Sequence, residues 1–308
     1  MQVSIIGNHI SVGFFIFLIG SFVIGVAATI LQVVLNLYLT VCRIGKTTAL
    51  QRQMIGGTSN SIGMAIAPLV ISYLIFHGTP LHDIVTKQFI IPLIILILIM
   101  LIITLLVGKT QMPSIDNVRQ APGENLDKSV WSFRNLKLGV WGIFFYVGIE
   151  VAVGANVNMY ASELGGSFAS NATHMAALYW GLLLLGRFLG SFIKQVPSEK
   201  QLVIASIGAI VLLVLAMLTA NPWILTLIGF FHSIMWPAIF TLATDQLGKY
   251  TTKASGVLTM GVIGGGIIPL LQGIFADVMG GNWLWTWLLV IAGEAYILYY
   301  GLNGYKQH

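Results

Sequence analysis

The chain has 308 residues, of which 57% are hydrophobic and only 8% charged, and its mean hydropathy is +0.89. An ordinary soluble domain carries roughly 25% charged residues, and a soluble fold of this composition would expose large apolar patches. A bilayer accepts an apolar exterior, so the composition indicates an all-α integral membrane protein. The net charge is +5, but the basic residues form no cluster with interleaved aromatics, which argues against a nucleic acid partner. The single cysteine, Cys42, excludes an internal disulfide and belongs to no metal motif.

Nine hydrophobic runs approach or exceed the roughly 20 residues that a transmembrane helix needs. We predict spans at residues 11–41, 55–77, 88–107, 138–161, 172–194, 200–220, 223–246, 255–279 and 283–302. Most connections are short and carry glycine, proline or asparagine. Residues 108–137 differ, because they contain Pro113, Pro122 and many charged residues. We therefore expect a partial N-terminal bundle of three spans (1–107), a water-exposed linker (108–137) and a six-helix C-terminal bundle (138–308).

The basic residues predict the orientation through the positive-inside rule. Thirteen of the fifteen lie in alternate connections, Arg187 lies near the same side, and the opposite connections hold only Lys87. The linker and the C-terminus are therefore expected on the cytoplasmic side of the cell (inner) membrane, and the N-terminus is expected on the outer side. Met1 to Ile10 lack the positive region of a signal peptide. Because transporters built from repeats normally have equal halves, three spans before the linker and six after it suggest a chain that starts midway.

An ionisable group at bilayer depth is costly and is therefore a functional candidate. Glu150 lies roughly 16 Å into its span at 1.5 Å per residue, near the membrane midplane. We predict that it carries or tunes a proton; the alternative is a structural acid that pairs with a base.

Several uncharged polar residues share helix faces within the spans. Gln32 and Asn36 are four residues apart, as are Asn156 and Tyr160, so each pair projects from one face. Amides and phenols both donate and accept hydrogen bonds, which suits sugar hydroxyls. The same groups are equally able to join neighbouring helices.

Two further residues are candidates for sugar contact. His232 precedes Trp236 by four residues, which places an aromatic platform beside it, although a lone histidine is more commonly a bonded structural residue. Gln272 follows Pro269 in the eighth span and allows the same two interpretations.

Other charged residues favour a structural role. Arg187 either snorkels toward the cytoplasm or pairs with Glu150, and Asp245 precedes Lys249 by one turn, as in a helix-end ion pair. Glu294 permits either interpretation. The sequence contains no Walker loop, metal-ligand spacing or Ser/His/Asp arrangement, so we expect neither an enzyme nor a cofactor.

Six stretches of the chain, in order, resemble the fucose/glucose/galactose:proton symporter family of the major facilitator superfamily. They are LQVVLNLYLTV (31–41), SNSIG (59–63), YVGIEVAVG (146–154), YWGLLLLGRFLGS (179–191), HSIMWPAIFTLATDQLGKYT (232–251) and GVIGGGIIPLLQGIFAD (261–277). The resemblance implies two six-helix bundles with a sugar site between them, alternating access and proton coupling. The chain would correspond to spans four to twelve of that architecture, without the first three.

The resemblance carries over to individual positions. Gln32 and Asn36 match the LQxxxNPY segment that contributes to the family's sugar pocket, and Glu150 matches the acid of YVGxEV. Leu37, Gly57 and His232 depart from the usual proline, glutamine and asparagine, which leaves the identity of the sugar open. The family's first helix carries an acid implicated in coupling, and that helix is not found here.

These observations together predict proton-coupled transport of a monosaccharide such as fucose, glucose or galactose. Glu150 would handle the proton, and the sugar ligands would be Gln32, Asn36, Asn156, Tyr160, His232 and Gln272. The expected partners are the sugar, protons and the lipid bilayer, and a monomer is expected. Two alternatives stay open: a transporter of another small solute, such as a nucleoside or organic acid, and a truncated protein that does not transport. An anionic solute would need a buried cation, and only Arg187 is available.

Overall fold

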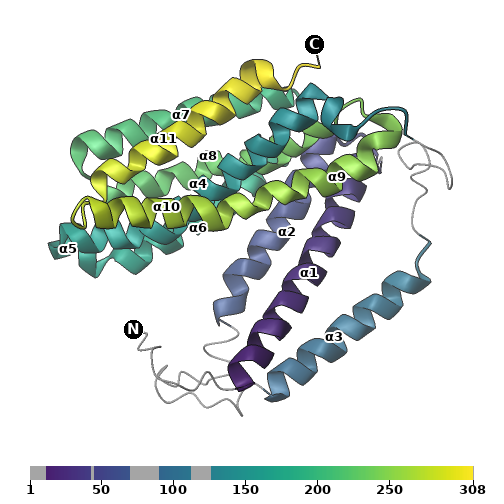
Figure 1. Ribbon diagram of the computed structural model, residues 1–308, viewed down its shortest axis with the longest axis horizontal. Coiled ribbons are helices and arrows are strands. Elements are labelled where there is room, and N and C mark those ends of the chain that lie inside the picture. Colours follow the sequence, from purple (N-terminus) through teal and green to yellow (C-terminus); the bar gives the residue numbers. More distant parts are fainter. Residues whose placement is uncertain (1–11, 43–44, 70–89, 112–125, 308) are drawn as a thin grey trace.

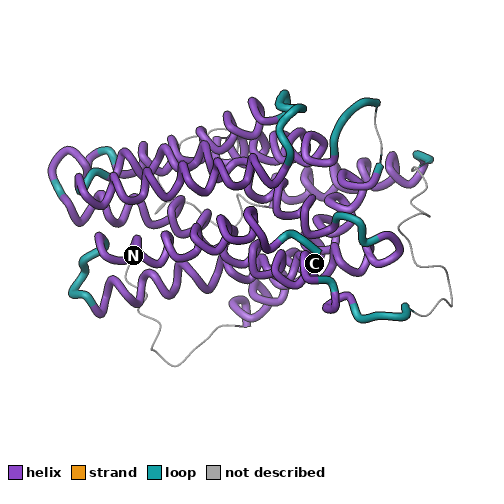
Figure 2. Tube along the Cα trace, turned by 90° about the horizontal axis from the view of Figure 1, so that it is seen from above, coloured by secondary structure: helices purple, strands orange, loops and turns teal. Residues whose placement is uncertain are grey.

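A computed structural model describes residues 12–42, 45–69, 90–111 and 126–307. Within these ranges the chain consists of helices and their connections (Figure 2), as expected for an all-α membrane protein. Several predictions lie partly outside the described residues. These are residue 11 of the first span, the second span after residue 69, residues 88 and 89 of the third span, the middle of the linker, and the basic residues Arg43, Lys87 and Arg119.

The helices overlap the predicted runs, although the second helix begins at Ala49, before the predicted start of the second span at residue 55. The first three are α1 (Val12–Val41), α2 (Ala49–Leu69) and α3 (Ile90–Lys109). After the linker come η5 (Val130–Ser132), α4 (Arg134–Leu164), the short α5 (Gly166–Ser170), α6 (Ala172–Gly190), α7 (Ser198–Thr219) and α8 (Pro222–Thr244). The chain ends with η6 (Gly248–Tyr250), α9 (Thr251–Thr259), η7 (Met260–Ile263), α10 (Gly264–Val278), η8 (Leu284–Thr286), α11 (Trp287–Tyr299) and the π-helical η9 (Tyr300–Gly304).

Each predicted span overlaps a helical segment of the described structure. By length and composition alone, six of these segments are apolar and long enough to cross a membrane: α1, α3, α4, α7, α8 and the run Gly248–Val278. The remaining predicted spans correspond to α2, α6 and α11. In α2 the first turns carry Gln51, Arg52 and Gln53, which lowers its apolar character.

The C-terminal bundle is built around α4 and α8. Helix α8 packs against α4, α6 and α7, while α4 also contacts α10 and α11. The interior contains fully buried aromatic side chains such as Tyr146, Phe240 and Trp287. Many large apolar side chains instead lie exposed on the outer helix faces. Because lipid tails accept such side chains, an apolar outside around a packed inside is the pattern of a membrane bundle.

The N-terminal helices extend away from this bundle. Helix α2 packs against α6 and α8, and α1 packs against α2 and α9. The Ser255 hydroxyl donates to the Val33 carbonyl over 3.1 Å, which joins α9 to α1. Helix α1 continues without a break through Leu37, the position at which the family usually has proline. Helix α3 stands apart in Figure 1 and buries none of its residues.

A glycine allows α10 to approach α4 at the start of the helix. A Cβ atom on Gly264 would overlap the backbone carbonyl of Phe144, and a backbone atom has little freedom to move away. A Cβ atom on Gly266, two residues later in the same helix, would meet nothing within 4 Å. Close backbone contact of this kind is characteristic of packing between membrane helices.

We expect Gly264→Ala to destabilise the protein by about 1–3 kcal/mol through overpacking. Gly266→Ala is the matched control, because it makes the same chemical change in the same helix where space is available. Thermal unfolding of the purified protein in detergent measures both variants. Equal stability of the two variants would contradict the close contact between α10 and α4.

Candidate functional site

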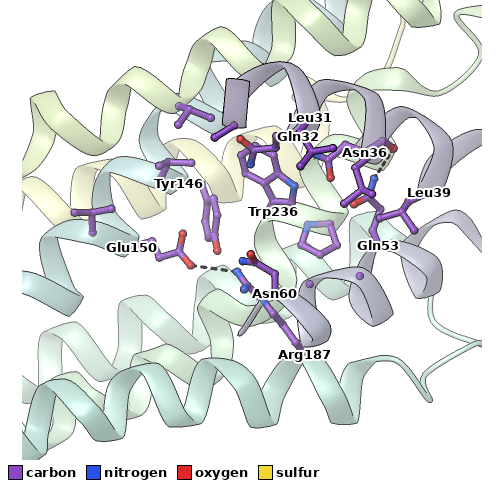
Figure 3. Close-up of a pocket in the computed structure, with 18 of the residues that line it drawn as sticks. Leu31, Gln32, Asn36, Leu39, Gln53, Asn60, Tyr146, Glu150, Arg187 and Trp236 are labelled. Atoms are coloured by element: carbon purple, nitrogen blue, oxygen red, sulfur yellow. Dashed lines mark hydrogen bonds and ion pairs between the residues drawn. The ribbon is translucent and has the colours of Figure 1, made fainter. Parts of the chain in front are cut away.

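A cavity of about 530 Å³ lies between α1 and α2 on one side and the C-terminal bundle on the other. Its volume falls within the roughly 300–1,000 Å³ typical of small-molecule sites. Figure 3 shows polar side chains from both groups of helices directed into this space. The cavity therefore brings together residues that are far apart in the sequence.

The N-terminal wall consists of two helix faces. Helix α1 contributes Gln32 and Asn36, and α2 contributes Gln53 and Asn60. Gln53 Nε2 donates to the Asn36 carbonyl over 2.8 Å and lies 2.9 Å from Thr40 Oγ1, so this side chain also fixes α2 against α1. The wall thus presents carboxamide groups, which both donate and accept hydrogen bonds.

The opposite wall is aromatic and charged. Tyr146 and Glu150 project from α4, Trp180 and Arg187 from α6, and Trp236 from α8. The combination of aromatic surface with a few convergent polar groups is typical of sites for small organic ligands.

An ion pair spans this wall. Arg187 Nη2 lies 3.3 Å from Glu150 Oε1, and the two side chains are only 9% and 13% exposed. Arg187 Nη1 also donates to Ser61 Oγ on α2 over 2.7 Å. One guanidinium therefore connects α4, α6 and α2 across the cavity. Removing one partner of such a buried pair typically costs about 3–5 kcal/mol.

The departure at Gly57 explains how Arg187 fits. A Cβ atom on Gly57 would lie 3.3 Å from Arg187 Cδ, closer than a relaxed contact. Gly57 thus leaves space for the arginine, where the resemblance led us to expect a glutamine. Beside Gly57 the cavity wall is therefore formed by the Arg187 guanidinium, which pairs with Glu150, and not by a glutamine amide.

Three of the predicted functional residues line the cavity, namely Glu150, Gln32 and Asn36. Arg187 also lines it and pairs with Glu150, which is one of the two interpretations that the sequence left open. The other predicted sugar ligands do not line it: Asn156, Tyr160, His232 and Gln272.

Two of these four residues hold helices together. Asn156 Nδ2 donates to Gln272 Oε1 over 2.9 Å, and Gln272 Nε2 donates to Thr286 Oγ1 over 3.1 Å. These two hydrogen bonds join α4, α10 and η8. Both amides therefore connect neighbouring helices, which was the alternative to sugar contact. Tyr160 is 1% exposed, and its ring lies 5.9 Å from that of Trp287, edge to face.

His232 is fully buried and bonded at both ring nitrogens. Its Nε2 lies 2.6 Å from Glu294 Oε1, and its Nδ1 lies 2.6 Å from the Tyr179 hydroxyl. The predicted platform beside it, Trp236, does line the cavity. The aromatic residue therefore faces the site, while the histidine lies behind it.

For the predicted pair of Asp245 and Lys249, the structure gives Lys249 an ion pair with Asp127, at 3.5 Å between Nζ and Oδ2. The Asp245 carbonyl accepts from Asn135 and Gln307. Among the described residues, no group of three or more His, Cys, Asp or Glu residues is arranged to hold a metal ion.

Sequence reasoning did not select Gln53, Asn60 or Trp180, although helical periodicity places each of them on a face that lines the cavity. On α2 the lining positions are Gln53, Gly56, Gly57 and Asn60, which follow the i, i+3, i+4, i+7 pattern of one helix face. This face combines polar and small residues. Its polarity, in a helix predicted to cross the membrane, was the feature of the sequence that indicated a cavity. Trp180 and Arg187 lie seven residues apart on α6 and share a face in the same way.

A bundle with an apolar exterior and a polar cavity between two groups of helices is the architecture of a membrane transporter. The family model of the Major Facilitator Superfamily matches residues 3–269, and the chain belongs to this family. It is therefore a multi-pass membrane protein of a transporter family and not an enzyme. The family expected from the sequence motifs is confirmed.

Named relatives lie within the same family. A putative glucose/galactose transporter of Helicobacter pylori is 33% identical over 312 residues, which span 96% of this chain and 75% of the relative. A glucose/galactose transporter of Brucella abortus is 34% identical over 301 residues, with coverage of 95% and 72%. The L-fucose-proton symporter of Escherichia coli is 26% identical over 292 residues, with coverage of 86% and 66%.

A solved structure supports the fold. The crystal structure of the Major Facilitator Superfamily transporter FucP in the outward conformation superposes with a TM-score of 0.80 at 24% sequence identity. The match covers 94% of this chain and 76% of FucP. The arrangement of the helices is therefore that of the superfamily.

The geometry separates two glutamines that look alike in the sequence. We expect Gln32→Ala to weaken sugar binding about three- to tenfold with little loss of stability, because it removes a hydrogen-bonding group from the cavity. We expect Gln272→Ala to lower stability by about 1–3 kcal/mol, because buried partners lose their bonds, with little change in affinity. Equilibrium binding and thermal unfolding of both variants measure this. The reverse pattern would contradict the assignment.

Proposed function

We propose that this protein transports a monosaccharide across the cell (inner) membrane by alternating access, and that a proton moves with the sugar. The observation that carries the proposal is the shared cavity, in which amides of α1 and α2 face aromatic residues and one ion pair of the C-terminal bundle. The relatives named as glucose/galactose transporters and as a fucose-proton symporter support the same substrate class.

The chemistry of the cavity suits a neutral, hydroxyl-rich ligand. Gln32 and Asn36 offer donors and acceptors to hydroxyl groups, while Trp180 and Trp236 offer apolar ring surfaces. An anionic solute would require a free cation, but the charge of Arg187 is matched by Glu150 at 3.3 Å. This arrangement favours a sugar over an organic acid.

In the proposed coupling, a proton and Arg187 compete for the Glu150 carboxylate. Protonating Glu150 removes the attraction that holds the guanidinium at this wall, while Ser61 keeps its bond to Arg187 from α2. The connection between α2 and α4 is then weakened, and the balance between conformations shifts. Proton and sugar binding become coupled equilibria, because both act on the same contact between α2 and the C-terminal bundle.

The remaining assignments are part of the same proposal. Residues 1–107 act as a partial N-terminal bundle of three spans, 108–137 as a cytoplasmic linker, and 138–308 as the six-helix C-terminal bundle. The N-terminus lies outside and the C-terminus in the cytoplasm, with the protein working as a monomer. The basic residues of the linker and of the alternate connections support this orientation.

We expect Glu150→Gln to abolish accumulation of sugar against its gradient, with at least about a tenfold loss. A glutamine side chain does not gain or lose a proton near neutral pH, and it carries no negative charge to pair with Arg187. Uptake is therefore no longer driven by the pH gradient. Uptake of labelled glucose, galactose and fucose into proteoliposomes with an imposed proton gradient measures the effect.

The matched control is Glu163→Gln on the same helix. Glu163 is exposed, and its Oε2 accepts from the Trp283 amide, a bond that glutamine retains. This control should accumulate sugar normally. Full accumulation by Glu150→Gln would remove Glu150 from the coupling, and failure of the unchanged protein to move any of the three sugars would reject the proposed function.

A further inference from the structure

A line of buried polar groups runs through the C-terminal bundle behind the cavity wall. It begins at Glu294 on α11, passes through His232 on α8 to Tyr179 on α6, and ends at the backbone carbonyl of Glu150 on α4. The side chains of Glu294 and His232 are both 0% exposed. Four helices are joined by this relay, and the coupling described above makes no use of it.

Two glycines allow the relay to close. A Cβ atom on Gly154, one turn beyond Glu150, would overlap the Trp180 ring and would lie 3.0 Å from Tyr179 Cε1. A Cβ atom on Gly229 would overlap the Tyr179 carbonyl. The two glycines leave space for Trp180 and Tyr179 between α4 and α8, and the Tyr179 hydroxyl donates to the Glu150 carbonyl over 3.1 Å.

The hydrogen-bond inventory fixes where each proton lies. A carbonyl oxygen only accepts, so the single Tyr179 proton is donated to Glu150. His232 Nδ1 must then carry a hydrogen and donate it to the Tyr179 oxygen. One more proton is required between His232 Nε2 and Glu294 Oε1, because otherwise a lone pair of the ring would face a carboxylate at 2.6 Å.

The far oxygen of Glu294 decides which atom holds that proton. Glu294 Oε2 is buried and has no hydrogen-bond partner among the described residues. A carboxylate would leave charge on this unpartnered oxygen in an apolar interior, which is costly. The neutral acid, with Oε1–H donating to His232 Nε2, avoids that cost.

We propose that Glu294 and His232 form a second proton-binding site, in which Glu294 is a neutral carboxylic acid that donates to His232, and that Tyr179 transmits its protonation state to the Glu150 turn of α4. This inference rests on the proposed function for its role in transport, but not for the protonation state itself.

Loss of the proton rearranges the relay. With Glu294 ionised, the remaining histidine proton moves to Nε2, where it faces the carboxylate. Nδ1 becomes an acceptor, so the Tyr179 hydroxyl turns to donate to it and its bond to the Glu150 carbonyl is lost. The relay then carries one proton fewer, which has passed to water. Release of the proton therefore removes the Tyr179 bond between α6 and α4, while the ion pair beside it remains.

Few other titratable groups act on this site. From α4 the Tyr146 ring lies 6.2 Å from that of His232, and Glu150 belongs to the same helix. From α6 come Tyr179 and Arg187. The other titratable residues of the packed helices lie toward helix ends or face other contacts: Arg52, Arg134, Lys137, Tyr160, Glu163, His174, Glu199, Lys200, Lys253, Asp277, Tyr296, Tyr299 and Tyr300.

Infrared spectroscopy tests the protonation state without any transport. The unchanged protein at neutral pH should show the carbonyl stretch of a protonated carboxylic acid, and Glu294→Gln should remove it. Glu163→Gln, which alters an exposed acid, should keep it. Glutamine can donate an amide hydrogen to His232 Nε2, so the variant retains the buried bond. Absence of the band from the unchanged protein, or its persistence in Glu294→Gln, would overturn the inference.

Transport tests the role of the relay. We expect Glu294→Gln to reduce proton-driven accumulation at least about tenfold and to remove one titrating step from its pH profile, while sugar exchange without a gradient continues. Tyr179→Phe keeps the acid and the histidine but lacks the hydroxyl, so its infrared band should remain while accumulation falls. If the unchanged protein accumulates sugar and both variants keep its pH profile, the relay has no coupling role and the proposed function still stands.

Discussion

The ion pair between Glu150 and Arg187 is the contact on which the rest of the site depends. Both side chains lie in a largely apolar bundle, where an unpaired charge is costly, so each requires the other at 3.3 Å. Arg187 reaches this position because Gly57 leaves space beside it, and it holds Ser61 of α2 at the same time. The Arg187 guanidinium, which neutralises Glu150 inside the C-terminal bundle, thereby also binds α2 of the N-terminal helices.

In the proposed function, this arrangement places proton chemistry and sugar binding on one surface. Gln32 and Asn36 line the same cavity as the ion pair, so a sugar held by these amides, as we propose, would lie beside the charged wall. Behind the wall, the relay from Glu294 reaches the backbone of the Glu150 turn itself. Two groups of Glu150 are thus held from α6, the side-chain carboxylate by Arg187 and the backbone carbonyl by Tyr179. In the proposed mechanism, movement of α4 relative to α6 would therefore depend on both contacts.

Much of the fold could be predicted from the sequence, because long apolar runs such as 90–109 have few alternatives to a membrane helix. Glu150, Gln32 and Asn36 could also be selected, since a polar group within an apolar run is conspicuous. The sequence could not decide which polar groups face one another. Gln272 and Asn156 share a bond over 2.9 Å, although they are 116 positions apart, and His232 is bonded to Glu294 and not exposed to the cavity. Such pairings depend on helix rotation, which local periodicity leaves undetermined.

Protection of a cysteine by sugar is the most direct test of the shared cavity. Because Cys42 is the sole cysteine of the chain, Cys42→Ser provides a background for Val151→Cys, which lies in the cavity wall beside Glu150. The exposed Ser129→Cys is the control. The account predicts that glucose, galactose or fucose slows maleimide labelling at position 151 and leaves labelling at position 129 unchanged. Equal labelling rates at position 151 with and without each of these sugars would contradict it.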